Sequence, residues 1–177
     1  MPAYAQTLTY LFAVMTVFLL ALVFTMAISR IAMGTWVPTR LMSYFQAYGL
    51  RIAMLFGVSA VCMSLWYSEV VGLPVCPLCW FARTMMYPLA VVLVVAVVRK
   101  DRTVWPYILS LSGIGMFITG YHHLYQIGFV EGALCKAIRD GGDCAQRFIF
   151  EFGFVTMPLM GFTLFVSIAL LAWLSRK

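Results

Sequence analysis

Charged side chains are scarce in this sequence. Only 10% of its 177 residues are Asp, Glu, Lys or Arg, and six of them are acidic. A soluble domain carries about 25% charged residues, so this scarcity excludes a water-soluble fold. Disorder is excluded as well, because disordered chains are poor in apolar residues. Here 64% of the residues are apolar and the mean hydropathy is +0.97. The composition therefore predicts a membrane protein.

Motifs for soluble cofactors are also missing. The sequence has neither a G-x-G-x-x-G dinucleotide motif nor a haem-binding C-x-x-C-H. The net charge of +6 could suggest a nucleic-acid partner. In so apolar a chain, however, Lys and Arg more often flank membrane segments. We predict contacts with membrane lipids and no nucleic-acid partner.

Five apolar stretches are long enough to cross a bilayer, which takes about 20 helical residues. They are Leu8–Ile28, Ile52–Val71, Trp80–Val98, Val104–Tyr125 and Phe154–Leu174. The first is predicted to be a retained span. Residues 1–7 hold no Lys or Arg, and its apolar run exceeds the about 7–15 residues of a signal peptide. The sequence thus predicts an all-α membrane protein, a four-helix transmembrane bundle with one additional N-terminal transmembrane helix.

The chain divides into three parts on this basis. Residues 1–36 are the additional N-terminal transmembrane helix, residues 37–51 a cytoplasmic interfacial segment, and residues 52–177 the four-helix bundle. In the middle part, four apolar or aromatic residues recur at helical spacing: Leu41, Tyr44, Phe45 and Tyr48. This spacing favours a short helix in the membrane surface. A connector without regular structure is the alternative.

The basic residues predict the orientation, because Lys and Arg collect on the cytoplasmic side of membrane proteins. The connections after the first and third spans and the C-terminal end hold eight Lys or Arg and one acid. The opposite connections hold three basic and five acidic residues. We therefore expect an extracytoplasmic N-terminus, a cytoplasmic C-terminus, and two outer connections at residues 72–79 and 126–153.

The five cysteines form two pairs and one single residue. Cys76 and Cys79 form a C-x-x-C before the third span, and Cys135 and Cys144 lie in the longer outer connection. Because the outer face is oxidising, thiols there persist as disulfides or exchange them. Cys62 lies within the second span, where burial makes a thiol inert, so we predict that it only packs.

The third span adds features that favour redox chemistry. Its start places Cys79 near a helix N-terminus, which favours thiolate over thiol. Arg83 follows one turn later on the same face and would stabilise a thiolate or an anionic ligand. Snorkelling of Arg83 to the interface is the alternative. His122 and His123 are expected level with these residues, where an imidazole can bind a ligand carbonyl, relay protons or simply contact water.

A structural zinc site is the alternative for the four outer cysteines, because four thiolates satisfy zinc. The eight residues between Cys135 and Cys144 exceed the usual spacing of a zinc knuckle. We therefore favour redox chemistry and predict no metal ligand. Outer dithiols need an electron acceptor to be reoxidised. Without a soluble-cofactor motif, a lipid-soluble quinone is the class that fits.

At these residues the sequence resembles the DsbB family, membrane thiol oxidases that reoxidise a periplasmic DsbA-like dithiol oxidase and pass the electrons to quinone. The matching features are the run from Pro74 to Arg83, the Tyr121-His122-His123 stretch, and the segment from Gly142 through Cys144 to Pro158. The resemblance covers about residues 50–177. Vitamin K epoxide reductase relatives place the loop pair before the C-x-x-C, whereas here the pair follows it.

The resemblance implies a protein-dithiol:quinone oxidoreductase of the inner membrane that uses ubiquinone or menaquinone. Its partners would be a periplasmic DsbA-like thioredoxin-fold protein and the membrane quinone pool. Cys135 would be attacked by the thiolate of the partner, and Cys144 would carry the electrons to Cys76.

The resemblance also implies a quinone site. Cys79 would contact and reduce the quinone, and Arg83, with His123, would hold its head group. Two departures from the family pattern stand out. The first span is an addition, and the loop between Cys135 and Cys144 is too short for the surface helix of some members.

Overall fold

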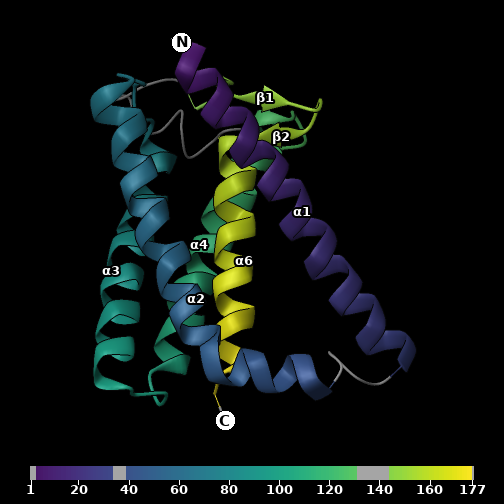
Figure 1. Ribbon diagram of the computed structural model, residues 1–177. Helices are drawn as coiled ribbons and strands as arrows, with labels where there is room; N and C mark the ends of the chain where they lie inside the picture. The colour runs from purple at the N-terminus through teal and green to yellow at the C-terminus, as the bar shows by residue number, and fades with distance from the viewer. Residues whose placement is uncertain (1–2, 34–38, 131–143, 177) are drawn as a thin grey trace.

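The computed structural model describes residues 3–33, 39–130 and 144–176, and helices dominate this part of the chain (Figure 1). The helices are α1 (Ala3–Met33), α2 (Thr39–Leu65), the π-helix η1 (Trp66–Val70), α3 (Pro77–Arg99), α4 (Trp105–Gln126) and α6 (Met157–Leu174). Four segments are long and apolar enough to cross a membrane: α1, α2 with η1, α3 and α6. The predicted all-α membrane bundle is confirmed.

Helix α4 is long but is not among the segments apolar enough to cross a membrane. Its 22 residues are long enough to span at about 1.5 Å per residue. Four of its polar side chains are buried: Ser112, Thr119, His122 and Gln126. These residues explain why α4 falls outside the set of apolar spans. Its crossing of the membrane stays a prediction.

Helix α2 joins two segments that the sequence analysis had separated. The predicted surface helix and the second span form one continuous helix from Thr39, so the alternative of an irregular connector is wrong for the described residues. In Figure 1 the first turns of α2 lie across the lower end of the bundle, and the helix then runs beside α3. Gly49 allows close contact with α6, because a Cβ there would lie 3.2 Å from the carbonyl oxygen of Leu171.

The core of the bundle lies where α2, α3, α4 and α6 meet. Its buried residues are Ala53, Leu89, Leu93, Ile108, Phe165, Ile168, Leu171 and Ala172. Helix α4 packs tightly on α6 at Gly115, where a Cβ would lie 2.5 Å from the ring of Phe165. Small residues at such crossings let membrane helices pack tightly.

Substitution of Gly115 tests this contact. Gly115→Ala should destabilise the protein by about 1–3 kcal/mol, because the new methyl group overpacks against Phe165. Gly113→Ala is the matched control, since a Cβ there meets nothing within 4 Å and alanine favours a helix by about 0.5–1 kcal/mol. Thermal unfolding in detergent micelles should shift in opposite directions for the two variants. Equal shifts would contradict the proposed packing.

Helix α1 leans across the bundle and packs against α6 and strand β2 (Figure 1). Thr9 Oγ1 lies 2.7 Å from the Tyr67 hydroxyl, which joins α1 to η1. The ring of Tyr10 lies 5.7 Å from that of Phe152. The additional helix is therefore anchored at the same end of the bundle as the cysteines.

A short hairpin precedes α6, which the sequence analysis did not predict. Strands β1 (Phe150–Glu151) and β2 (Val155–Thr156) pair antiparallel. Phe152 and Gly153 make the turn with φ angles of 54° and 77°.

The fifth span therefore begins at Met157, not at Phe154. The Oγ1 of Thr156 caps the helix by accepting a hydrogen bond from the amide of Leu159. Pro158 lies in the first turn, where its missing N–H costs nothing.

Candidate functional site

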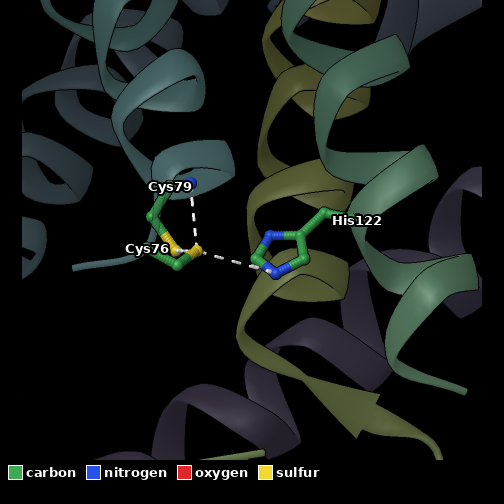
Figure 2. A group of neighbouring side chains, drawn as sticks. All are labelled: Cys76, Cys79 and His122. Atoms are coloured by element: carbon green, nitrogen blue, oxygen red, sulfur yellow. Dashed lines mark hydrogen bonds between the residues drawn. The ribbon is translucent and has the colours of Figure 1, made fainter. Parts of the chain in front are cut away.

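The C-x-x-C lies at the N-terminus of α3. Cys76 is the N-cap residue, and Pro77 fixes the first turn. The amide of Cys79 donates to the Cys76 sulfur at 3.3 Å, and the two Sγ atoms are 2.6 Å apart. Figure 2 shows the two sulfurs beside each other, with that of Cys76 in contact with His122 of α4. One helix turn thus holds the two thiols in position for a disulfide.

The charge of this thiol pair is held on Cys76. The side-chain hydrogen bond with Cys79 lowers the pKa of Cys76 to about 5; burial opposes this shift and His122 adds to it. The sequence analysis had placed the helix-stabilised thiolate on Cys79, but the amide of the first turn points at the sulfur of Cys76. The reason is that the N-cap position, one residue before the helix, belongs to Cys76.

A pH titration of the reduced protein tests this assignment. Alkylation of Cys76 should rise with pH through a midpoint near 5, because the thiolate is the reactive species and is already present above that pKa. His122→Phe should move the midpoint upward, toward an ordinary thiol. His123→Phe is the matched control and should leave it unchanged. Mass spectrometry of the Cys76 peptide gives the rate, and an unmoved midpoint in His122→Phe would refute the role of this imidazole.

His122 connects the two cysteine segments. Its Nε2 lies 3.8 Å from the sulfur of Cys76 and 3.2 Å from the backbone oxygen of Cys144. Gln126, one turn further along α4, donates from Nε2 to the backbone oxygens of Cys144 and Gln146 at 3.2 and 3.3 Å. Both side chains are buried. Helix α4 thereby holds the Cys144 segment against the C-x-x-C.

His123, the histidine that the resemblance placed with the quinone, faces the hairpin. Its Nδ1 lies 2.8 Å from Thr156 Oγ1. The resemblance thus predicts His123 at the site, whereas the structure brings His122 to the cysteines. Gln126 also lies there, and the sequence analysis did not predict it. The i, i+4 spacing of His122 and Gln126 was the signal in the sequence, because such residues share a helix face.

Arg83 is buried one turn after Cys79. Its Nη2 donates to the backbone oxygen of Ser64 at 2.8 Å, just before α2 passes into η1. Its guanidinium lies 5.3 Å from the ring centroid of Trp80 and acts electrostatically on Cys79. With 8% of its surface exposed, Arg83 does not snorkel to the interface. The structure thus places a cation beside the C-x-x-C, and its role toward a thiolate or a ligand stays a prediction.

Cys144 completes the buried cluster. It is 1% exposed, disulfide-bonded, and packed with Cys76 and Leu78. A cavity of about 20 Å³ is lined by Cys144, by both C-x-x-C cysteines, and by His122 and Gln126 among others. The C-x-x-C and the Cys144 segment therefore line one small cavity.

Two cysteines are not part of this cluster as described. Cys135, the predicted point of attack by a partner, lies outside the described residues. Cys62 was expected to be buried, but its side chain is exposed on α2. The prediction that Cys62 packs in the interior is wrong, because an apolar span presents part of its surface to lipid as well as to the core.

Comparison with known proteins points to disulfide chemistry. The family model described as "Disulfide bond formation protein DsbB" matches residues 46–175. "Probable disulfide formation protein C 2" of Bacillus anthracis is 32% identical over 136 residues, which cover 76% of this chain and 95% of that protein. "Probable disulfide formation protein" of Metapseudomonas resinovorans is 33% identical over 128 residues, which cover 72% and 89%. No solved structure matches the chain.

Proposed function

This chain belongs to the DsbB family of disulfide bond formation proteins, and from that premise we propose that it reoxidises a DsbA-like dithiol oxidase and passes the electrons to membrane quinone. The family match and the helical bundle make it a multi-pass membrane protein with a role in disulfide bond formation. The specific client, the quinone dependence and the residue roles below belong to the proposal.

The first steps are two disulfide exchanges. A client thiolate attacks Cys135 in a Cys135–Cys144 disulfide, and Cys144 leaves as a thiolate. Cys144 then attacks Cys76 of an oxidised Cys76–Cys79 pair, which forms a Cys76–Cys144 bond and releases Cys79 as a thiolate. The second client thiolate displaces Cys135 and closes the client disulfide. Two electrons have then moved into the enzyme, and the burial of Cys76 with Cys144 supports this order.

Formation of the Cys76–Cys144 bond changes which residue carries the negative charge. In the free dithiol, the hydrogen bond from Cys79 stabilises the thiolate of Cys76. Once Cys76 is in a disulfide it no longer accepts that bond, and Arg83 is the remaining cation beside Cys79. The electron pair thus comes to lie on the cysteine nearest the buried guanidinium.

The residues around Cys79 fit a quinone head group that arrives from the membrane. Arg83 is a buried donor for a carbonyl oxygen that gains negative charge, and Trp80 and Phe81 are exposed apolar rings on the same helix. The cavity of about 20 Å³ between the cysteines holds no more than about one water molecule, so a ring cannot bind there. Quinone would supply a two-electron, two-proton acceptor at the lipid-facing side of Cys79.

The orientation follows from the same proposal. The C-x-x-C and the Cys144 segment lie at one end of the bundle, and the C-terminus lies at the other (Figure 1). We place the cysteine end outside the cytoplasm, at the inner membrane of the cell, because the basic connections flank the opposite end.

The observation that carries the proposal is the cluster of buried Cys76 and Cys144 with half-buried Cys79, beside Arg83. Its test uses the purified full chain in detergent without oxygen, with a reduced thioredoxin-fold dithiol protein as client. Client oxidation should require added ubiquinone or menaquinone and should form one quinol per client disulfide. Equal client oxidation without any quinone would overturn the proposal.

A further inference from the structure

Three metal-binding atoms converge at the N-terminus of α3. The Sγ atoms of Cys76 and Cys79 and the Nε2 of His122 all lie within 4.8 Å of one another (Figure 2). Two thiolates and an imidazole are a common ligand set for Zn²⁺. The three residues come from two helices that pack side by side, so the geometry is held by the fold.

The distances between the donor atoms suit a tetrahedral ion. Zn–S bonds of about 2.3 Å and Zn–N bonds of about 2.0–2.1 Å place the ligand atoms about 3.5–3.8 Å apart. The Cys76 sulfur and the His122 Nε2 are already 3.8 Å apart. Ligation takes the tautomer with its proton on Nδ1, so Nε2 gives up its contact with the backbone oxygen of Cys144, which keeps the hydrogen bond from Gln126. The two sulfurs, at 2.6 Å, must separate by about 1 Å, which a small rotation of the half-buried Cys79 side chain provides.

A fourth position is available beside these three atoms. The Oε1 of Gln126 is buried and has no hydrogen-bond partner among the described residues, and the side chain is only 7% exposed. Gln126 lines the same cavity of about 20 Å³, which has room for about one water molecule. A metal-bound water in this cavity would donate to the unpaired oxygen of Gln126. The unpaired Oε1 of Gln126 is thus a second observation, independent of the three clustered ligand atoms.

We propose that the reduced Cys76–Cys79 dithiol, together with His122, binds Zn²⁺, and that the bound ion arrests the enzyme in its reduced state. Binding releases the remaining thiol protons and forms two Zn–S bonds and one Zn–N bond, with no change of oxidation state. The oxidised pair has no thiolate to offer, and Cys76 offers none while it is bonded to Cys144, so the site exists only while both cysteines of the pair are free thiols, as they are in this structure. The arrest of turnover rests on the proposed function, whereas the metal site does not.

Metal binding is measured on the reduced, quinone-free full chain in detergent. Co²⁺ serves as the spectroscopic probe, and Zn²⁺ is added in competition. We expect one Co²⁺ per chain with thiolate-to-metal absorption, displaced by Zn²⁺, and no such absorption in the oxidised protein. Cys76→Ser, Cys79→Ser and His122→Ala should each abolish the spectrum. Gln126→Leu should weaken binding by about tenfold, as loss of an outer-sphere partner does.

Three control variants separate this site from others. Cys62→Ser and His123→Ala should bind Co²⁺ as the unmodified chain does, because neither residue belongs to the cluster. The double variant Cys135→Ser/Cys144→Ser should also bind it. Loss of binding in that double variant would mean a four-cysteine zinc site and would overturn the proposal. Unaltered binding in His122→Ala, or none in the unmodified reduced chain, would overturn it too.

The effect on turnover is measured separately. Zn²⁺ should inhibit client oxidation when added to enzyme that is already reduced, and a chelator should restore the rate. Failure of this inhibition in a chain that binds Co²⁺ would refute the arrest alone. Turnover in chelator-treated buffer tests the oxidase proposal without any metal. A failure of the oxidase proposal can therefore be told apart from a failure of the zinc proposal.

Discussion

Cys79→Ser is expected to abolish quinone reduction by a reduced client while leaving the bundle folded. Cys79 is the cysteine next to the buried Arg83. In the proposed order of reaction steps, its thiolate is the group that faces the acceptor. Serine keeps the size of the side chain but cannot form a disulfide with Cys76 or give up an electron pair at neutral pH. No other described cysteine takes this position, because Cys76 is turned toward His122.

The first exchange should survive in the same variant. A client thiolate can still attack Cys135 of the Cys135–Cys144 disulfide, so each enzyme molecule should oxidise one client and then stop, which a non-reducing gel of the client shows. Quinone absorbance gives the steady-state rate. Cys62→Ser is the control and should turn over at the unmodified rate, because Cys62 lies on the exposed surface of α2. Continued quinone reduction in Cys79→Ser would remove Cys79 from the mechanism.

Arg83→Met is expected to lower the rate of quinone reduction by about 10²–10³-fold, the usual effect of removing a donor aimed at developing negative charge. Methionine fills much of the same space without a charge or a donor. Arg83→Lys should recover part of the rate, because the ammonium keeps the charge but lacks the planar fork of donors. The KM for quinone should rise as well, since the head group loses a binding partner.

A structural role of Arg83 must be separated from this effect, because its Nη2 also binds the backbone oxygen of Ser64. The exchange between the client and the Cys135–Cys144 disulfide does not use Arg83, so its single-turnover rate should remain normal in Arg83→Met. Arg99→Met is the matched control, since Arg99 is an exposed arginine at the opposite end of the same helix. Parallel loss of the exchange step and of quinone reduction would mean that Arg83 only supports the fold.

The sequence predicted the helices because a long apolar run has few other structures available in a bilayer. It could not predict that α2 continues through the expected surface segment, since this depends on the contact of Gly49 with α6. The sequence also did not predict the hairpin before α6, because it depends on local geometry that leaves no pattern of alternating residues. Its strands are two residues each and rest on the left-handed φ angles of Phe152 and Gly153.

The candidate site was likewise predictable from the sequence only in part. Spacing alone placed Arg83 beside Cys79, because residues four apart share one helix face. The choice between His122 and His123 could not be made that way, since adjacent residues point about 100° apart and the rotation of α4 depends on its packing. Likewise, the position of Cys76 as the N-cap became clear only once the first residue of α3 was known.

The small size of the cavity between the cysteines also affects the kinetics. A space of about 20 Å³ admits neither a client loop nor a quinone ring, so in the proposed cycle we expect the client and the quinone to reach the enzyme through separate ports, one facing water and one facing lipid. We therefore expect no direct reaction between the two proposed substrates. Such an enzyme alternates between its oxidised and reduced forms in a ping-pong cycle. A lipophilic inhibitor at the membrane port would therefore bind a different form of the enzyme from the one the protein client binds.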